Sequence, residues 1–537
     1  MKNFYKILSF LLIVGFLFNS CRNPAYNIDV TVDANIMNYK ATLLVSDVNG
    51  VVPAGLTVSV TGQDAAKVYD FSATKAIYAP GGIVTLGIPY MYTPEANKPL
   101  VFNMLFKAPG YMDKLIPMEI QLGQWMQTVL VTMTKPDQNT VAAAFKEQNT
   151  VLSATGATTA AVTVATTSNA NVTQATTITI PAGTQFKDAS GATLTGTLAS
   201  TAITYDTADP RSLGLFPGGD MSAPVVTLPS GAGSAFFFPA GFTTILMEVG
   251  GKQVKTFANN PVTVKIQIDP TYKIVATSAL VKAGDQLAIY SYEVATGVMK
   301  FESNQTVIAD GAGKLAVQFT TTHLTDYVAT ETKETTTCKD VKVTASASWL
   351  TDGASRPVTV QLFRANGTVL IGSSALTLSD GLVSTLGLLP EVPVQYKVID
   401  ITGEQLAEGT ILNPCAGEPL NVVIRKPTGV IDAVRLTLNV YCPDKGKIMV
   451  PNFDMFFKLP GETTYKLLGT FSKGVLTTSA LKVGSTYDFK AVWGNKVKLG
   501  MSRTITEADM AKTVGDGYYG DTTEPNRGFL VEACNGI

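Results

Sequence analysis

The sequence predicts an all-β protein made of tandem β-sandwich domains. The chain has 537 residues, and a single hydrophobic core rarely serves more than roughly 250–300, so several domains are expected. Its apolar share of 46% is ample for globular cores, whereas its charged share of 15% lies below the usual ~25%. Thr, Ala, Val and Gly fill that gap, which favours strands because β-branched side chains suit a pleated surface and glycine suits turns.

Short segments of alternating apolar and polar residues support this fold class. In residues 261–269, "PVTVKIQID", apolar side chains occupy every second position, the period of a strand with one buried face. Residues 41–52, "ATLLVSDVNGVV", are typical of two strands joined by an Asp-Val-Asn-Gly turn. We expect one short helix at residues 141–148 and another at residues 506–513.

The charge balance argues against a nucleic-acid partner. The chain carries 41 Lys and Arg and 42 Asp and Glu, and its formal net charge is −1. Proteins that bind nucleic acids concentrate Lys and Arg where they neutralise phosphates, and anionic membrane surfaces attract similar cationic clusters. We therefore expect no nucleic-acid partner and no electrostatic docking on a membrane.

Residues 1–20 have the pattern of an export signal. Lys2 and Lys6 precede an apolar run over residues 7–18. A membrane-spanning helix needs about 20 such residues, so the shorter run is typical of the core of a signal peptide. No later segment is long and apolar enough to span a bilayer.

The end of this segment resembles the lipobox of bacterial lipoproteins. Residues 18–21 are Phe-Asn-Ser-Cys, so a small residue stands directly before Cys21. The resemblance implies that Cys21 receives a diacylglyceryl thioether and becomes the first residue of a mature protein anchored in the membrane by lipid. Arg22, rather than aspartate, follows, which implies sorting to the outer membrane. More than one acyl chain anchors stably, since each buried CH₂ contributes about 0.8 kcal/mol. The alternative is an ordinary signal peptide with an incidental cysteine.

Two stretches in the second half of the chain resemble each other. Residues 360–406 align with residues 454–499, and Gly372 matches Gly469 in this alignment. Each copy shows short alternating strands separated by turn residues. We therefore expect two tandem β-sandwich domains.

The remaining cysteines flank these two copies. Cys338 and Cys415 lie before and after the first copy, and Cys442 and Cys534 before and after the second. An exported compartment is oxidising enough for disulfides, so the simplest pairing gives each copy its own bridge. The alternative is that the thiols bind a metal, but they are widely spaced, without a CxxC pair or a nearby histidine. We expect no metal and no cofactor.

The chain is expected to divide at residues where composition and pattern change. The segments are a signal peptide (1–20), an N-terminal domain (21–136), a middle domain (137–332), a first repeat domain (333–428) and a second repeat domain (429–537). Residues 137–148 are expected to be the linker before the middle domain.

Two of these domains resemble known sandwich families. The strand-turn units of the N-terminal domain, such as residues 101–122, resemble carboxypeptidase-regulatory-type or transthyretin-like domains. Trp349, shortly after Cys338, resembles the tryptophan of an immunoglobulin-like core. Trp493 stands much later after its cysteine, so we expect both tryptophans simply to fill cores.

The middle domain resembles the self-cleaving GAIN-type β-sandwich of adhesion receptors. The resemblance covers residues 139–331 and rests on the order of strands and turns and on the tripeptide His323-Leu324-Thr325, which contains the only histidine of the chain. It implies that the Thr325 hydroxyl attacks the Leu324 carbonyl, giving an ester that water hydrolyses. His323 would be the general base, since imidazole titrates near neutral pH and a free hydroxyl is a weak nucleophile.

An inert strand explains the same tripeptide, and we favour it. His-Leu-Thr can arise by chance in a Thr-rich β protein, and cleavage also needs a strained peptide or an oxyanion donor. In this interpretation Leu324 and Tyr327 pack inward, or His323 hydrogen-bonds to a neighbouring strand.

No other catalytic set is visible in the sequence. No GxSxG elbow accompanies His323, and no P-loop, Rossmann fingerprint or histidine cluster occurs, so we expect no enzyme. Tyr518 and Tyr519, on a Gly-rich loop, could stack on sugar rings or anchor a protein partner; the alternative is that they cover the end of the sandwich. Residues 236–238, all phenylalanine, are expected to enter the core.

Together these features predict a lipid-anchored, exported protein with a structural or adhesive role. Its sandwich domains would be presented to a protein or glycan partner. Two alternatives stay open: a self-cleaving surface protein cut between Leu324 and Thr325, and a carbohydrate-binding accessory lipoprotein. The body would face either the periplasm or the cell exterior.

Overall fold

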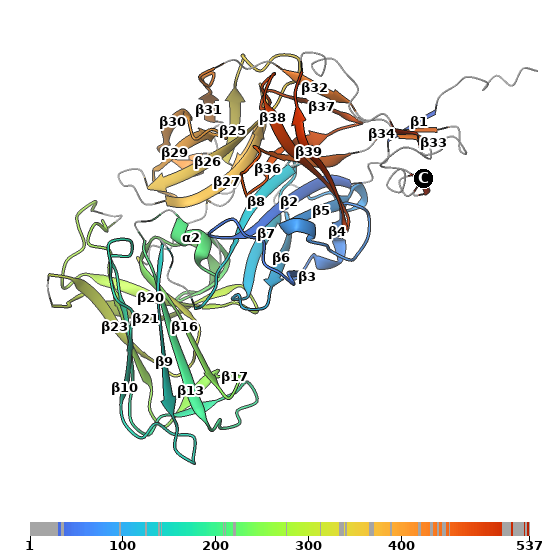
Figure 1. The fold of residues 1–537 in the computed structure, drawn as a ribbon. Helices are drawn as coiled ribbons and strands as arrows, with labels where there is room; N and C mark the ends of the chain where they lie inside the picture. The colour runs from blue at the N-terminus through green and yellow to red at the C-terminus, as the bar shows by residue number, and fades with distance from the viewer. Residues whose placement is uncertain are drawn as a thin grey trace, which may run out of the picture.

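The computed structural model is built almost wholly from β-strands, which confirms the all-β fold class (Figure 1). Helix α2 (Arg211–Leu215) is a short α-helix of five residues in the middle domain. In that part of the chain no helix is long and apolar enough to cross a membrane. The structure describes residues 30–33, 37–95, 98–123, 126–137, 140, 142–207, 209, 211–217, 222–274, 277–311, 313–331, 338, 341–364, 370–386, 389–416, 420–429, 433–437, 440–442, 447–450, 452–506, 517–518, 531 and 534–535.

The N-terminal domain is a sandwich of two sheets, with strand orders β8-β2-β5-β4 and β3-β6-β7. Along β6, Phe102, Met104 and Phe106 are buried while the residues between them are partly exposed, so one strand face fills the core. Its elements are β2 (Met37–Asp47), β3 (Thr57–Thr61), η1 (Ala65–Lys67), β4 (Tyr69–Asp70), η2 (Pro80–Gly82), β5 (Ile83–Pro89), η3 (Tyr90–Tyr92), β6 (Leu100–Lys107), β7 (Lys114–Ile120) and β8 (Met126–Met133).

The two repeat domains share one strand order. The order β27-β26-β29-β30 in the first matches β36-β35-β38-β39 in the second. The first contains β25 (Val341–Ser346), β26 (Arg356–Arg364), β27 (Leu370–Leu378), β28 (Val383–Leu386), β29 (Val394–Asp400), β30 (Gln405–Ile411), η4 (Pro414–Ala416) and β31 (Leu420–Val423). The second contains β32 (Val434–Thr437), β33 (Val440–Cys442), β34 (Lys447–Val450), β35 (Phe453–Lys458), β36 (Lys466–Phe471), β37 (Val475–Thr478), β38 (Thr486–Trp493), β39 (Lys496–Thr504) and β40 (Gly517–Tyr518).

Each repeat domain carries its own disulfide. Cys338 is joined to Cys415 and Cys442 to Cys534, the pairing expected from the repeat. The bridges close sequence separations of 77 and 92 residues. In the chain-entropy model, closing loops of this length stabilises the folded state by about 4–5 kcal/mol each.

The N-terminal domain has the same topology as the first repeat domain, which the sequence comparison missed. Strand β2 is antiparallel to β5 and parallel to β8, and β25 is likewise antiparallel to β28 and parallel to β31. The facing sheets also correspond, with orders β3-β6-β7 and β26-β29-β30. Three of the domains are therefore variants of one sandwich.

The middle domain is a larger sandwich. Its sheets have the orders β10-β11-β19-β23-β22 and β15-β14-β21-β20-β24-β16-β13-β9, with β17 paired to β16 and a small sheet β12-β18. The strands are β9 (Ala143–Val151), β10 (Val162–Ala165), β11 (Thr176–Ile180), β12 (Gln185–Lys187), β13 (Thr197–Tyr205), β14 (Ser222–Leu228), β15 (Gly231–Phe236), β16 (Pro239–Val249), β17 (Lys252–Gln253), β18 (Thr256–Ala258), β19 (Val262–Gln267), β20 (Gln286–Glu293), β21 (Val298–Thr306), β22 (Ile308–Ala309), β23 (Leu315–Thr321) and β24 (Asp326–Thr330).

Both faces of the longer sheet are buried near its centre. One face, including Ile245 and Ile289, packs against the sheet that contains β11 and β19. The other face carries Tyr205, Phe242 and Tyr290, which pack with helix α2 and with side chains of neighbouring domains. Strand β24, which pairs with both β16 and β20, is buried at all five positions, including the polar Asp326 and Thr330.

Two expectations about residues 137–148 are wrong. The predicted helix at 141–148 is instead the start of β9, which pairs with β13 from Ala143↔Tyr205 to Val151↔Thr197. The same pairing makes residues 143–148 part of the sheet rather than of a linker. Long-range pairing and alternating burial override the local preference of Ala, Lys and Glu for helix. Of the other expected helix, residues 507–513 lie outside the described part of the chain.

The domains contact one another through paired strands and buried side chains, in addition to the chain that links them. Strand β8 of the N-terminal domain pairs with β27 of the first repeat domain at Thr128↔Ala375, so two sandwiches contribute to one eight-stranded sheet. Phe236 and Phe238 of the middle domain, buried as predicted, pack with Ile371 of the first repeat domain. Figure 1 shows the N-terminal domain lying beside both the middle domain and the two repeat domains.

Candidate functional site

The His323-Leu324-Thr325 tripeptide forms the corner between β23 and β24. Backbone contacts secure it, since Leu324 N–H donates to the Lys255 carbonyl at 3.0 Å and His323 bridges Thr256 of β18. The His323 carbonyl accepts hydrogen bonds from the hydroxyls of Thr321 at 3.0 Å and Tyr327 at 2.7 Å. The corner is thus held by hydrogen bonds to the segment that leads into β18 and to side chains of β23 and β24.

The imidazole of His323 is directed toward a carboxylate. Its Nε2 lies 3.4 Å from Glu302 Oε1, and its Nδ1 lies 3.4 Å from the Thr321 hydroxyl. Burial alone would raise the pKa of Glu302, but hydrogen bonds from His323 and Ser291 outweigh it and hold that pKa below its ordinary value. The ring therefore takes part in a polar cluster on the sheet.

Thr325 has a different partner. Its hydroxyl donates to the Tyr292 carbonyl of β20. Among the described residues, no hydrogen bond joins His323 to Thr325. The general base and the nucleophile that the GAIN-type resemblance implies are therefore not hydrogen-bonded to each other, and the Thr325 hydroxyl instead binds the backbone of β20.

The carboxyl group next to this corner is buried. Asp326 is 3% exposed and accepts a hydrogen bond from the Thr244 hydroxyl, which in turn contacts Tyr205 at 2.9 Å. Burial raises the pKa of Asp326 to about 7, against the opposing effects of the Thr244 hydrogen bond and the positive charge of Lys114. Asp326 is the most strongly perturbed carboxyl group in the tripeptide region, and sequence reasoning did not single it out.

The other predicted site residues lie partly outside the described chain. Cys21 and Tyr519 are among the residues that the structure does not describe. Tyr518 belongs to β40 and pairs with Tyr441 of β33, so its backbone lies in a sheet and not in the free loop we expected. Trp349 packs against the core of the first repeat domain and donates its Nε1 hydrogen to the Ile424 carbonyl at 2.9 Å, as expected of a core tryptophan.

Buried cations lie where the domains meet, and none of them was anticipated from the sequence. Lys40 of β2 contacts Asp454 of β35, and only 7% of the Lys40 side chain is exposed. Asp454 also accepts hydrogen bonds from Thr42 and Thr470. Burial lowers the pKa of Lys40, and the nearby Asp454 carboxylate opposes that shift. This cluster joins the N-terminal domain to the second repeat domain.

Arg356 joins the two repeat domains. Its Nε and Nη2 donate to the two carboxylate oxygens of Asp400 at 2.5 and 2.9 Å, the planar two-bond geometry that arginine favours. Its Nη1 donates to the Ser479 carbonyl of the second repeat domain. Burial would raise the pKa of Asp400, but the Arg356 hydrogen bonds outweigh it and lower that pKa.

Arg364 joins the first repeat domain to the middle domain. Its Nη2 lies 3.3 Å from Glu331 Oε1, and its guanidinium carbon lies 5.0 Å from the ring centre of Phe238 and 5.1 Å from that of Tyr272. The Tyr272 hydroxyl also donates to Glu331 at 3.0 Å. The cation is thus paired with a carboxylate and placed over two aromatic faces.

Lys114 joins the N-terminal domain to the middle domain. Its Nζ donates to the Gly214 carbonyl at 2.6 Å and to the Phe216 carbonyl, which lie at the end of helix α2. A cation is favourable beside the unpaired carbonyls at a helix C-terminus. Thr134 supports the same contact by donating to the Leu215 carbonyl at 2.8 Å.

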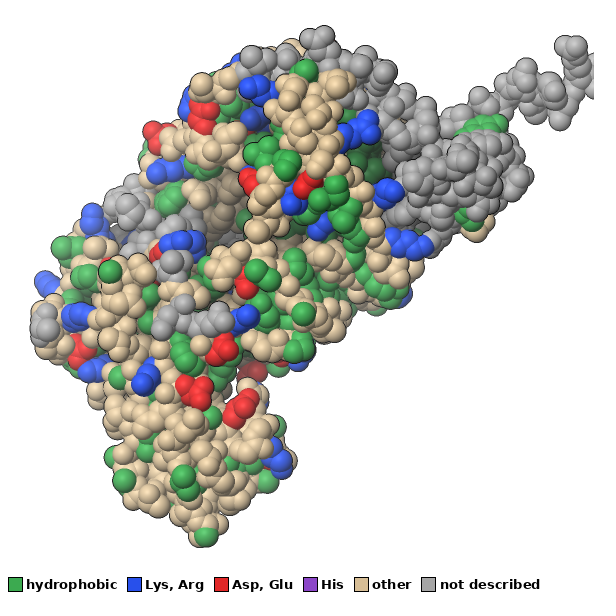
Figure 2. Space-filling view, in the orientation of Figure 1, with side chains coloured by type: hydrophobic (Ala, Val, Ile, Leu, Met, Phe, Trp, Pro, Cys, Tyr) green, Lys and Arg blue, Asp and Glu red, His purple; other side chains and the backbone are tan. Residues whose placement is uncertain are grey.

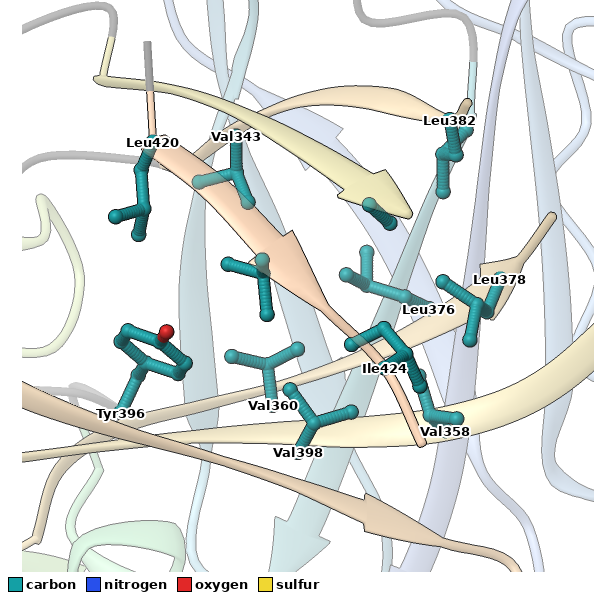
Figure 3. A pocket seen from close by; sticks show the side chains of 12 residues that line it. Val343, Val358, Val360, Leu376, Leu378, Leu382, Tyr396, Val398, Leu420 and Ile424 are labelled. Carbon is teal, nitrogen blue, oxygen red and sulfur yellow. The ribbon is translucent and has the colours of Figure 1, made fainter. Parts of the chain in front are cut away.

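The first repeat domain encloses a small apolar cavity between its two sheets (Figure 3). Its volume is about 50 Å³. The Tyr396 hydroxyl is the polar group among the lining side chains shown. The lining residues are Val343, Ala345, Val358, Val360, Leu376, Leu378, Leu382, Tyr396, Val398, Leu420, Val422 and Ile424. These residues form the sandwich core, so the cavity is a packing gap within it.

Charged side chains do not gather on the visible surface. On the face in Figure 2, Lys and Arg side chains are interspersed with Asp, Glu and uncharged residues.

Comparisons with known proteins give little further guidance. No protein-family model matches the chain, and no curated protein matches it. The Bacillus anthracis TIE protein is 12% identical, with 71% of this chain and 58% of that chain covered and a TM-score of 0.13. A streptococcal ancillary pilin is 10% identical, with 45% and 95% covered and a TM-score of 0.13. Domains 4–9 of the surface layer protein SbsC are 11% identical, with 86% and 74% covered and a TM-score of 0.09. Similarity at this level supports no inference about function.

Proposed function

We propose that this chain is an exported structural or adhesive protein, held in the outer membrane by lipid on Cys21. The observation that carries the proposal is the set of buried cations that join its domains: Lys40, Lys114, Arg356 and Arg364. A chain of sandwiches on flexible linkers would move independently, because interfaces within a chain are usually polar and modest. Here each contact buries charge with specific partners, so the domains form one body that presents its surfaces in fixed directions.

Domains held in fixed positions relative to one another suit an adhesive or scaffolding protein. A partner that contacts two domains at once gains from their fixed spacing, since less ordering entropy is lost when it binds. The expected partner is a protein or a glycan.

Fractionation of cells tests the anchor. Wild-type protein should be found in the outer-membrane fraction, and the Cys21→Ser variant should be released into the soluble fraction. Equal membrane content of the two proteins would contradict the proposal. Protease treatment of intact cells then shows whether the body faces outward.

Adhesion is tested on the same strains. Cells that carry the wild-type protein should adhere to a protein- or glycan-coated surface more strongly than cells with the released Cys21→Ser variant. Equal adhesion across a panel of glycans and extracellular proteins would contradict the adhesive role.

A further inference from the structure

A small sheet gathers segments from both ends of the chain. The four-stranded sheet β1-β34-β33-β40 begins with β1 (Val30–Asp33) and ends with β40, near the C-terminus. Strand β1 runs parallel to β34, from Val30↔Lys447 to Asp33↔Val450. The Cys442–Cys534 disulfide fixes the end of β33 to the C-terminal segment. Strand β1 is therefore held to the second repeat domain.

The position of β1 limits how far this sheet can lie from Cys21. Val30 comes nine positions after Cys21 in the sequence. A fully extended chain spans at most about 3.3–3.6 Å per residue, so the sheet lies within about 30 Å of the Cys21 sulfur. Strand β13 alone contains nine residues and has a similar length of about 30 Å. The tether can thus reach about the length of a single strand, whereas the body contains several sandwich domains.

The other end of the molecule is formed by the middle domain. Figure 1 shows β1, β33 and β34 projecting beside the second repeat domain, far from β9, β10, β13 and β17. The strand register places the end of β9, the start of β13 and the β16–β17 turn together, since Val151 pairs with Thr197 and Leu198 with Val249. Val151 is 72% exposed there.

We infer that the sheet β1-β34-β33-β40 is the membrane-proximal end of the protein and that the β9–β13–β17 end of the middle domain points away from the bilayer. The inference rests on the proposed lipid anchor at Cys21. Its physical basis is the short tether combined with the pairing of β1 to β34, which fixes where the anchored segment enters the rigid body. The surface opposing the sheet is a phospholipid bilayer, and the distal turns are the first surfaces that a partner meets.

Energy transfer from protein to membrane tests this orientation. Acylated protein is reconstituted into phosphatidylethanolamine and phosphatidylglycerol vesicles that contain a headgroup acceptor dye. A donor is placed at Lys473→Cys or at Ser190→Cys, both at exposed positions. Lys473 lies beside the sheet, because its N–H donates at 2.8 Å to Asn452, two residues after β34 ends. Ser190 lies in a turn of the middle domain.

Transfer should be several-fold more efficient from position 473 than from position 190. A flexible Gly-Ser insertion of about 20 residues after Asn27, with a mean span of about 25 Å, should reduce that difference. Equal transfer, or greater transfer from position 190, would overturn the orientation while leaving the anchor intact. Mass spectrometry of the same protein shows whether Cys21 carries fatty acid, and its absence would contradict both the anchor and the orientation.

Discussion

Lys40 in β2 contacts Asp454 in β35, although 414 positions of the chain separate them. The pair joins the N-terminal domain to the second repeat domain, and the Asp454 side chain is fully buried. Two hydroxyls complete the cluster, from Thr42 of the first domain and Thr470 of the last. The contact therefore links the second repeat domain, late in the sequence, back to the N-terminal domain.

Replacing one member of this pair should destabilise the folded protein. Lys40→Met leaves the Asp454 carboxylate buried without its cation, and removing one partner of a buried pair costs about 3–5 kcal/mol. The double variant Lys40→Met/Asp454→Leu should be destabilised less than Lys40→Met alone, because no charge is left unpaired. The free energy of unfolding by urea, followed by tryptophan fluorescence, measures both effects.

Lys98→Met is the matched control for that measurement. Lys98 pairs with Glu95 at 3.8 Å, and both side chains are about three-quarters exposed, at 74% and 75%. An exposed pair of this kind contributes about 0–1 kcal/mol. If Lys40→Met were as mild as Lys98→Met, the buried contact would have no role in joining the domains.

The stability of the protein should fall as the pH rises through neutrality. The folded-state pKa of Asp326 is raised from 3.8 to about 7, so folding favours the protonated carboxyl. Its contribution is fully present below the ordinary carboxyl pKa and is lost as the pH rises toward and through about 7. A shift of this size corresponds to on the order of 4 kcal/mol at most.

Asp326→Asn isolates this effect because asparagine keeps the Thr244 hydrogen bond without ionising. Its melting temperature should exceed that of the wild type at pH 8 and approach it at pH 5. The exposed Asp352→Asn should leave the wild-type pH profile unchanged. Parallel pH profiles for Asp326→Asn and the wild type would show that Asp326 does not titrate in this range.

Filling the cavity of the first repeat domain should stabilise it. Val422→Ile adds one methylene group to a side chain that lines the cavity, and burying a methylene contributes about 0.8 kcal/mol. Val423→Ile, on the next residue of β31, adds the same group to a side chain that is 76% exposed. Thermal unfolding should give a higher melting temperature for Val422→Ile only. A loss of stability in Val422→Ile would mean that the space is already filled.

The chain should remain uncut at the His-Leu-Thr corner. The Thr325 hydroxyl donates to Tyr292, and the His323 ring lies against Glu302 and Thr321. On a denaturing gel, wild type and Thr325→Ala should each give one band. Two fragments from the wild type and one band from Thr325→Ala would establish self-cleavage instead.

The sequence was informative where local patterns and tertiary structure agree. The matched glycines Gly372 and Gly469 revealed the repeat, and the flanking cysteines then indicated the two disulfides. The third copy of the fold escaped notice because β4 has only two residues and pairs with β5, whereas its counterpart β27 pairs with β26. A strand as short as β4, paired with a different neighbour than its counterpart, does not produce a matching pattern in the sequence.

The buried cations show why the interfaces could not be predicted. In β2, Lys40 lies between Tyr39 and Ala41, which face the core of the N-terminal domain. Alternation therefore places Lys40 on the outer face, which would ordinarily be exposed to solvent. The packing of the second repeat domain, through Asp454, buries it together with Phe71 of its own domain. The strand β9 was missed for a similar reason, since its pairing with β13 is a long-range effect.

The central claim, an exported body on a lipid tether, is tested most directly at the first residue of the mature protein. Mass spectrometry of protein isolated from membranes should find Cys21 at the N-terminus, carrying a diacylglyceryl group on its sulfur. An unmodified Cys21, or a mature chain that begins at another residue, would contradict the account.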